Sequence, residues 1–140
     1  MNVDEAQWPL VRIEMNEAFT AETVAAYIQL WEQCLLRKQR FGMLMIQPGD
    51  SAKRPNREVT ATYVDWCKAH RAQIAQYCAG IAVVLPSSKL LLLYKPVTAL
   101  STRKMYGCPG QAFPHEAEAA EWLKGLLSEA DGTAGAGGMR

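Results

Sequence analysis

The sequence lacks the short motifs by which many enzymes and metal sites are recognised. It has neither a G-x-G-x-x-G nor a Walker pattern, which argues against nucleotide binding of those kinds. Its two histidines, His70 and His115, form neither H-x-x-x-H nor H-E-x-x-H, and its four cysteines include no C-x-x-C pair. We therefore expect no metal and no cofactor, and we expect the cysteines to be buried, reduced thiols.

An excess of charge of one sign is also lacking, as is a long hydrophobic run. Fifteen Lys and Arg residues balance fourteen Asp and Glu residues, so no overall field exists to hold nucleic acid. The longest strongly apolar stretch, residues 81–97, is interrupted by Pro86, Lys89 and Lys95 and falls short of the roughly 20 residues of a membrane span. The N-terminal residues carry acids where a secretory signal carries bases. These absences predict a cytoplasmic protein without a nucleic-acid partner or a transmembrane segment, and they leave peripheral membrane contact open.

A pattern of buried and half-buried strands is present. Residues 80–86, GIAVVLP, form an unbroken apolar run rich in β-branched side chains, which is typical of a central parallel strand buried on both faces. Residues 8–15 alternate with a period of two, and residues 41–47 form a second short apolar run. A short edge strand fits residues 111–113. Four strands are therefore expected.

Helical patterns alternate with these strands. Four helices are predicted, at residues 21–40, 59–77, 89–105 and 114–127. Within the third, Leu90–Tyr94 could instead be a strand; helix is favoured, and Pro96 must kink or shorten it. The order of elements predicts an α/β domain with a four-stranded, mostly parallel or mixed sheet flanked by about four helices. This single domain should span residues 8–130, between a flexible N-terminus at 1–7 and a disordered Gly/Ala-rich tail at 131–140.

Four consecutive leucines make the third predicted helix unusual. They cannot all face one core stripe, because a helix turns by about a quarter to a third of a circle per residue. At least one should therefore contact a partner, a ligand cavity or a dimer seam. The predicted interaction surface consists of Leu90, Leu92, Leu93, Val97 and Leu100, flanked by Lys89, Lys95, Arg103 and Lys104.

The loop after the second predicted strand is a candidate switch or anion site. It follows a buried strand and precedes a helix, which is where parallel α/β folds place binding loops. Its candidate residues are Asp50, Ser51, Lys53 and Arg54. They could hold an anion or a phosphorylated Ser51, and the competing interpretation is an ordinary solvated loop.

His70 is the candidate general base of the chain. It shares a helical face with Trp66 and Ile74, and Asp65 or Cys67 could accompany it in an enzyme. No nucleophile or second histidine is placed with it by sequence spacing, so a histidine at the edge of the core is the favoured interpretation.

The C-terminal part of the chain resembles a known family. The pattern F-x-x-x-x-E-A-x-x-W-L falls on Phe113, Glu118, Ala119, Trp122 and Leu123. Together with Trp8 and Pro9 before the first strand, and with the runs MLMIQ and GIAVVLPSS, it resembles the small bacterial STAS-like domains related to the anti-sigma factor antagonist. Members carry a phosphorylatable serine in an Asp-x-Ser-x-x-Asp-Ser loop, for which Ser51 is the nearest substitute here, although the motif itself is not matched.

The resemblance implies a non-enzymatic binding module that works by protein contact or, in some relatives, by holding a small apolar ligand. The leading hypothesis is therefore a protein-interaction module acting as a cytoplasmic regulatory or scaffold subunit, through a protein partner or self-association. The alternative is a carrier or sensor of a small apolar ligand or lipid, with a pocket under residues 90–100.

Overall fold

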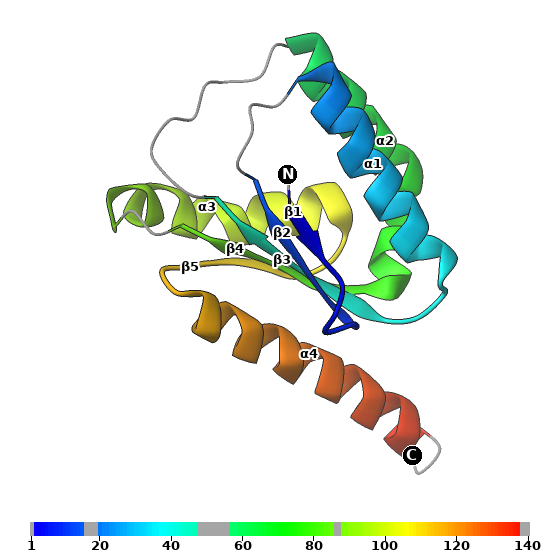
Figure 1. Ribbon diagram of the computed structural model, residues 1–140. Helices are drawn as coiled ribbons and strands as arrows, with labels where there is room; N and C mark the ends of the chain where they lie inside the picture. The colour runs from blue at the N-terminus through cyan, green and yellow to red at the C-terminus, as the bar shows by residue number, and fades with distance from the viewer. Residues whose placement is uncertain (1, 16–19, 48–56, 86–87, 138–140) are drawn as a thin grey trace.

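The computed structural model describes residues 2–15, 20–47, 57–85 and 88–137. Five strands and four helices follow one another in this part of the chain (Figure 1): β1 (Asn2–Asp4), β2 (Leu10–Glu14), α1 (Ala21–Leu36), β3 (Phe41–Ile46), α2 (Arg57–Tyr77), β4 (Cys78–Val84), α3 (Ser88–Tyr106), β5 (Gly110–Phe113) and α4 (Glu116–Gly137). The α/β class, a mixed sheet and four helices are confirmed.

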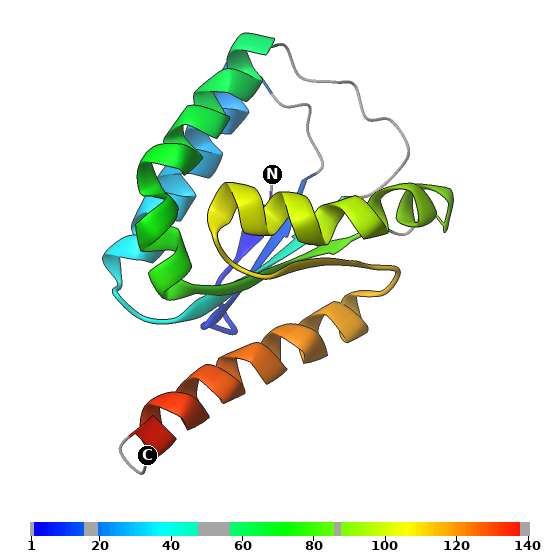
Figure 2. The same ribbon diagram turned by 180° about the vertical axis from the view of Figure 1, so that it is seen from behind.

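The strands form one sheet in sequential order, β1-β2-β3-β4-β5. β1 runs antiparallel to β2, and each later strand is parallel to its neighbour. Because crossovers between parallel strands are almost always right-handed, a sheet built in this order receives its crossover helices on one face. Figures 1 and 2 show that arrangement: α1, α2 and α3 lie on one face of the sheet, and α4 lies on the other.

β4 is the buried inner strand that the apolar run predicts. It pairs in parallel with β3 and with β5, and all its residues except the half-buried Val83 are buried. It begins at Cys78, two residues before the predicted start. Ile81 belongs to the core beneath α1 and α2, whereas Ala82 and Val84 belong to the core beneath α4. Both faces of this strand are therefore covered by helices.

The prediction of four strands is wrong, because the chain folds back at its N-terminus. Asn2–Asp4, expected to be flexible, pairs with Arg12–Glu14 as the edge strand β1. A turn joins the two strands: the Trp8 amide donates to the Glu5 carbonyl, and the Leu10 amide donates to the Gln7 carbonyl. All three residues of β1 are exposed, so the strand has no apolar alternation by which its sequence could be recognised.

The largest differences from the predicted helix lengths are at the C-terminal ends of α1 and α4. α1 stops at Leu36 rather than Arg40, and Lys38 adopts a positive φ of 53°, which no helix accommodates. Leu90–Tyr94 is helical, as favoured, and α3 continues past Pro96 to Tyr106 without being shortened. α4 continues to Gly137, so residues 131–137 are helical where disorder is predicted. Extending an existing helix is far easier than starting one, so the helix continues here although the segment holds three glycines.

Candidate functional site

α3 is held on the sheet by one side of the helix. Thr102 is buried against β5, where a Cβ atom added to Gly110 would lie 2.3 Å from the Cβ atom of Thr102. Tyr106 is also buried, and Leu91 is half-buried. Helix and strand therefore approach so closely that only glycine fits at position 110, and the rest of the helix surface faces outward.

Predicted interaction residues lie on that outward side. Leu92 is 80% exposed, Val97 is 53% exposed and Leu100 is 73% exposed. Of the other two predicted residues, Leu90 and Leu93, only the helical backbone is described. Because Leu91 points inward while Leu92 points outward, the leucine run divides between core and surface as helical geometry requires.

Only positive charge surrounds these apolar side chains on α3. The helix contains no Asp or Glu, and its basic residues are all exposed: Lys89, Lys95, Arg103 and Lys104. None of these cations makes an ion pair with a described residue. We call Leu92, Val97 and Leu100 together with these four cations the outer face of α3.

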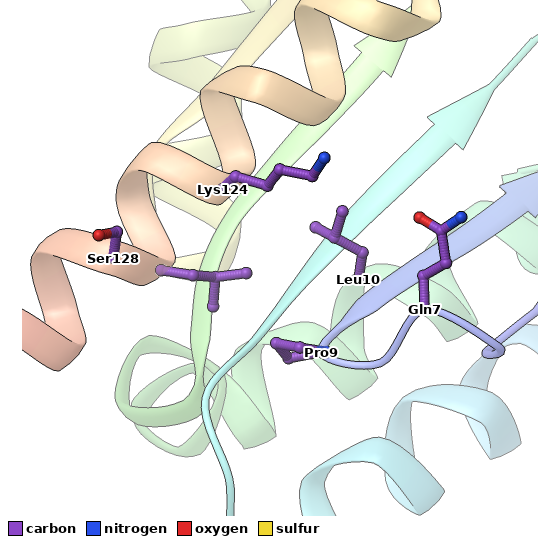
Figure 3. Close-up of a pocket in the computed structure, with 6 residues that line it drawn as sticks. Gln7, Pro9, Leu10, Lys124 and Ser128 are labelled. Atoms are coloured by element: carbon purple, nitrogen blue, oxygen red, sulfur yellow. The ribbon is translucent and has the colours of Figure 1, made fainter.

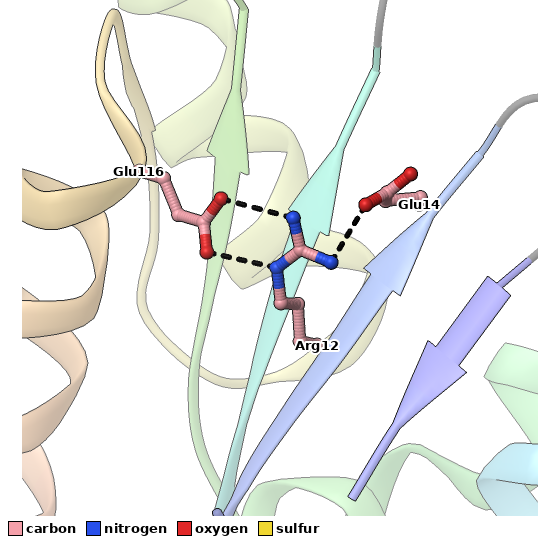
Figure 4. Close-up of polar contacts among 3 residues, drawn as sticks. All are labelled: Arg12, Glu14 and Glu116. Carbon is pink, nitrogen blue, oxygen red and sulfur yellow. Dashed lines mark hydrogen bonds and ion pairs between the residues drawn. The ribbon is translucent and has the colours of Figure 1, made fainter.

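A second cluster of charges lies at the carboxyl ends of the strands, on the face covered by α4 (Figure 4). Arg12 of β2 donates from Nε to Glu116 Oε2 at 2.8 Å and from Nη2 to Glu116 Oε1 at 3.1 Å. Its Nη1 donates to Glu14 Oε1 at 2.7 Å. These hydrogen bonds raise the pKa of Arg12 above its ordinary value, and they lower the pKa of Glu116. The cluster fastens the first turn of α4 to the sheet.

Sequence reasoning did not anticipate the Arg12 cluster. Arg12 occupies a polar position of the alternating first strand, and Glu116 resembles any acid in the first turn of a helix. The two residues are 104 positions apart, and nothing in either local pattern pairs them.

Replacing Glu116 with glutamine should lower the free energy of unfolding at pH 7 by about 1 kcal/mol or less, because the ion pair is partly exposed. The pKa of Glu116 is lowered in the folded protein, so the ionised carboxylate stabilises the fold above its unfolded pKa near 4.5. That contribution disappears as the pH falls through the lower, folded pKa. The difference between wild type and Glu116→Gln in urea unfolding should therefore shrink below about pH 4.5.

Glu121→Gln is the matched control. Glu121 is 77% exposed, and its carboxylate makes only a long ion pair, at 3.7 Å, with Lys124. The substitution should change stability little at either pH. An equal effect of the two substitutions, or a Glu116→Gln effect that does not vary with pH, would argue against the Arg12–Glu116 link.

His70 packs against Trp66 of the same helix. Its Nδ1 donates to the Trp66 carbonyl at 2.8 Å, and its ring stacks on the Trp66 indole at a centroid distance of 4.4 Å. Neither Asp65 nor Cys67 is hydrogen-bonded to it among the described residues. Burial raises the pKa of Cys67 to about 11, so this thiol is protonated and weakly nucleophilic at neutral pH.

The other residues considered in the sequence analysis do not come together as a site among the described residues. Asp50, Ser51, Lys53 and Arg54 lie outside the described residues. All four cysteines are buried and free, as expected. Within the described ranges, no group of three or more His, Cys, Asp or Glu side chains gathers as metal ligands would. None of the helices described there is both long and apolar enough to cross a membrane.

Two shallow, open pockets lie on the surface of the described part of the chain. One, of about 340 Å³, lies between the turn after β1 and α4 (Figure 3), and is lined by Gln7, Pro9, Leu10, Lys124, Leu127 and Ser128. The other, of about 430 Å³, lies between α1 and α2, and is lined by Gln29, Glu32, Gln33, Leu35, Leu36, His70 and Gln73. Neither of these two pockets is lined by a described residue of α3.

Comparison of the chain with known protein families, with curated proteins and with solved structures finds no match to any of them. The function must therefore be inferred from the residues and their arrangement.

Proposed function

We propose that the chain is a non-enzymatic protein-interaction module, a cytoplasmic regulatory or scaffold subunit that binds its partner through the outer face of α3. The observation that carries this proposal is the exposure of Leu92, Val97 and Leu100 on one helix that holds only cations. Burying an exposed leucine in an interface contributes about 1.5–3 kcal/mol before the costs of association. Three such side chains provide the apolar centre of a contact, and the cations provide its polar rim.

A STAS-like domain is our proposal for the finer class of the fold. The residues that carry the resemblance belong to β5 and α4, and they pack between this helix and the sheet. The rings of Phe113 and Trp122 lie 5.5 Å apart, and Ala119 and Leu123 are fully buried beneath the helix. STAS-like domains are expected to bind other molecules without catalysing a reaction. The proposed function rests only in part on the resemblance to them.

A carrier of a small apolar ligand is the alternative function, and the packing of α3 favours it less. Such a ligand would lie between α3 and the sheet. Neither of the two surface pockets is lined by a described residue of α3, and at the C-terminal end of α3 Thr102 lies against Gly110 with no space between them. The outward leucines suit contact with another macromolecule better than enclosure of a ligand.

Site-specific cross-linking tests the proposed function. A photoreactive amino acid placed at position 92 or 100 should cross-link one and the same protein in cells that produce the chain. The cross-link should weaken strongly when Lys95 and Arg103 are both changed to Glu. A photoreactive residue at Glu121, on exposed α4, is the control and should not capture that protein. Equal capture from position 121, or none from 92 and 100, would count against the proposal.

A further inference from the structure

The outer side of α1 is the electrostatic opposite of α3. The sixteen residues of α1 include no Lys or Arg, and both of its acids, Glu22 and Glu32, are exposed. Neither acid makes an ion pair with a described residue. Leu36, at the end of the helix, is 75% exposed. Within its own bounds each helix therefore carries charge of a single sign, negative on α1 and positive on α3, and Arg37 and Lys38 follow Leu36 directly after α1 ends.

A concave surface accompanies the acids of α1. The pocket of about 430 Å³ between α1 and α2 has Leu35 and Leu36 on one side and His70 on the other. Among the described residues, no Lys or Arg lines it, and Glu32 is the one carboxylate there. The His70 ring is fixed there by its hydrogen bond to the Trp66 carbonyl and by stacking on the Trp66 indole. We call this pocket the α1–α2 groove.

The nearest cation after α1 is already engaged. Arg37 donates to Glu5 at 2.9 Å, and its guanidinium lies 4.0 Å from the centre of the Trp8 ring. This arrangement neutralises the charge of Arg37. Lys38 follows it and is exposed, but among the described residues Glu32 is the charged residue that lines the groove.

A symmetric contact between two α3 helices is disfavoured by charge. It would bring four cations of one molecule against four of another, with no acid on either helix. Like charges brought together and desolvated in this way oppose association. The α1–α2 groove, whose described lining holds one carboxylate and no Lys or Arg, is instead complementary to the basic, convex outer face of α3.

We propose that the partner of the outer face of α3 is a second copy of this chain, which receives it in its α1–α2 groove. The inference rests on the proposed function and names its partner. Leu92 would pack beside Leu36, Leu100 would lie about 12 Å further along α1, and the cations of α3 would face Glu22 and Glu32. By the rise of a helix, α3 is about 28 Å long and α1 about 24 Å, so the two can lie along each other.

The two surfaces belong to different parts of one molecule. α2 contacts both α1 and α3 and stands between them in the layer above the sheet (Figures 1 and 2). The contact is therefore heterologous: each molecule that offers its α3 keeps its own groove free for the next. Such contacts close into a ring or extend into a chain of molecules.

Mixing two blocked variants tests this arrangement. Leu92→Gln/Leu100→Gln removes the apolar centre of the outer face of α3, and Glu32→Lys/Leu36→Lys destroys the groove. By light scattering over a concentration series, the wild type should exceed the 15.5 kDa of one chain, and less so at high salt. Each variant alone should associate on the order of a hundredfold more weakly. An equimolar mixture should form a complex of two chains and stop there, because only one intact surface of each kind remains.

Glu118→Lys/Glu121→Gln on α4 changes the net charge by the same amount as the groove variant and is its control, since both residues are exposed on a helix outside the contact. It should associate like the wild type, and the urea midpoint of every variant shows whether it is folded. Three results would overturn the inference: a wild type that stays monomeric, a variant that associates undiminished, or a mixture that remains monomeric while the wild type associates.

The cross-linking experiment separates this inference from the proposed function. Cross-links from positions 92 and 100 that map to α1 or α2 of a second copy support both. Cross-links to another protein, with a monomeric chain, overturn only the identity of the partner. No cross-link from either position overturns both.

Discussion

Gly110→Ala should lower the free energy of unfolding by about 3 kcal/mol, because it overpacks the contact between α3 and β5. The new Cβ atom would lie 2.3 Å from the Cβ atom of Thr102, whose position is set by the backbone and does not change with side-chain rotation. β5 cannot move away easily, since Gly110 is paired with Ile81 and the Ile81 amide donates to the Pro109 carbonyl at 2.9 Å. Urea unfolding followed by far-UV circular dichroism measures the change.

Gly125→Ala is also a glycine-to-alanine substitution, but we expect it to raise the free energy of unfolding. Gly125 is exposed in α4, and a Cβ atom there would meet nothing within 4 Å. Alanine should therefore raise the free energy of unfolding by about 0.5–1 kcal/mol, through helix propensity alone. If Gly110→Ala proved as harmless as Gly125→Ala, the close approach of α3 to β5 would be wrong, and with it the orientation of the outer face of α3.

Leu123→Ala should cost about 3 kcal/mol, whereas Leu92→Ala should change stability by less than about 0.5 kcal/mol. Leu123 is fully buried between α4 and the sheet, so truncation loses its burial and leaves a cavity. Leu92 is 80% exposed, so the same truncation removes little packing. The comparison holds the chemistry of the substitution constant and varies only the location of the leucine.

Thermal and urea unfolding of both variants would check this pair. A large loss from Leu92→Ala would place Leu92 in the core and remove the apolar centre of the proposed contact. A small loss together with weaker self-association is the expected combination, because a residue at a contact between molecules contributes to binding and not to the fold of the single chain.

Elements with a strong local period could be predicted from the sequence. The run GIAVVLP marks a strand buried on both faces, and β4 is that strand. Apolar spacing of three and four residues marks α1, and its buried side chains include Val24, Tyr27 and Trp31. The division of the leucine run between core and surface also follows from helical geometry. When one side of a helix or strand is buried, apolar residues recur in its sequence with the period of that element. These features can therefore be predicted without the rest of the chain.

Features that depend on partners far away in the chain could not be predicted. β1 has three exposed residues and exists because a turn returns it to β2. Arg12 meets Glu116 because the sheet order and the course of α4 bring their ends together. The α1–α2 groove likewise arises where two separate helices lie side by side.

The sequence by itself determined that this is an α/β chain with an inner buried strand and with one helix too apolar for its own core. Only the tertiary structure decided which leucines of that helix face outward, that the cations beside them are unpaired among the described residues, and that a groove whose described lining holds one carboxylate lies on a different pair of helices. The physical reason is that periodicity records burial, which is local, whereas the complementarity of two surfaces depends on how distant elements pack together.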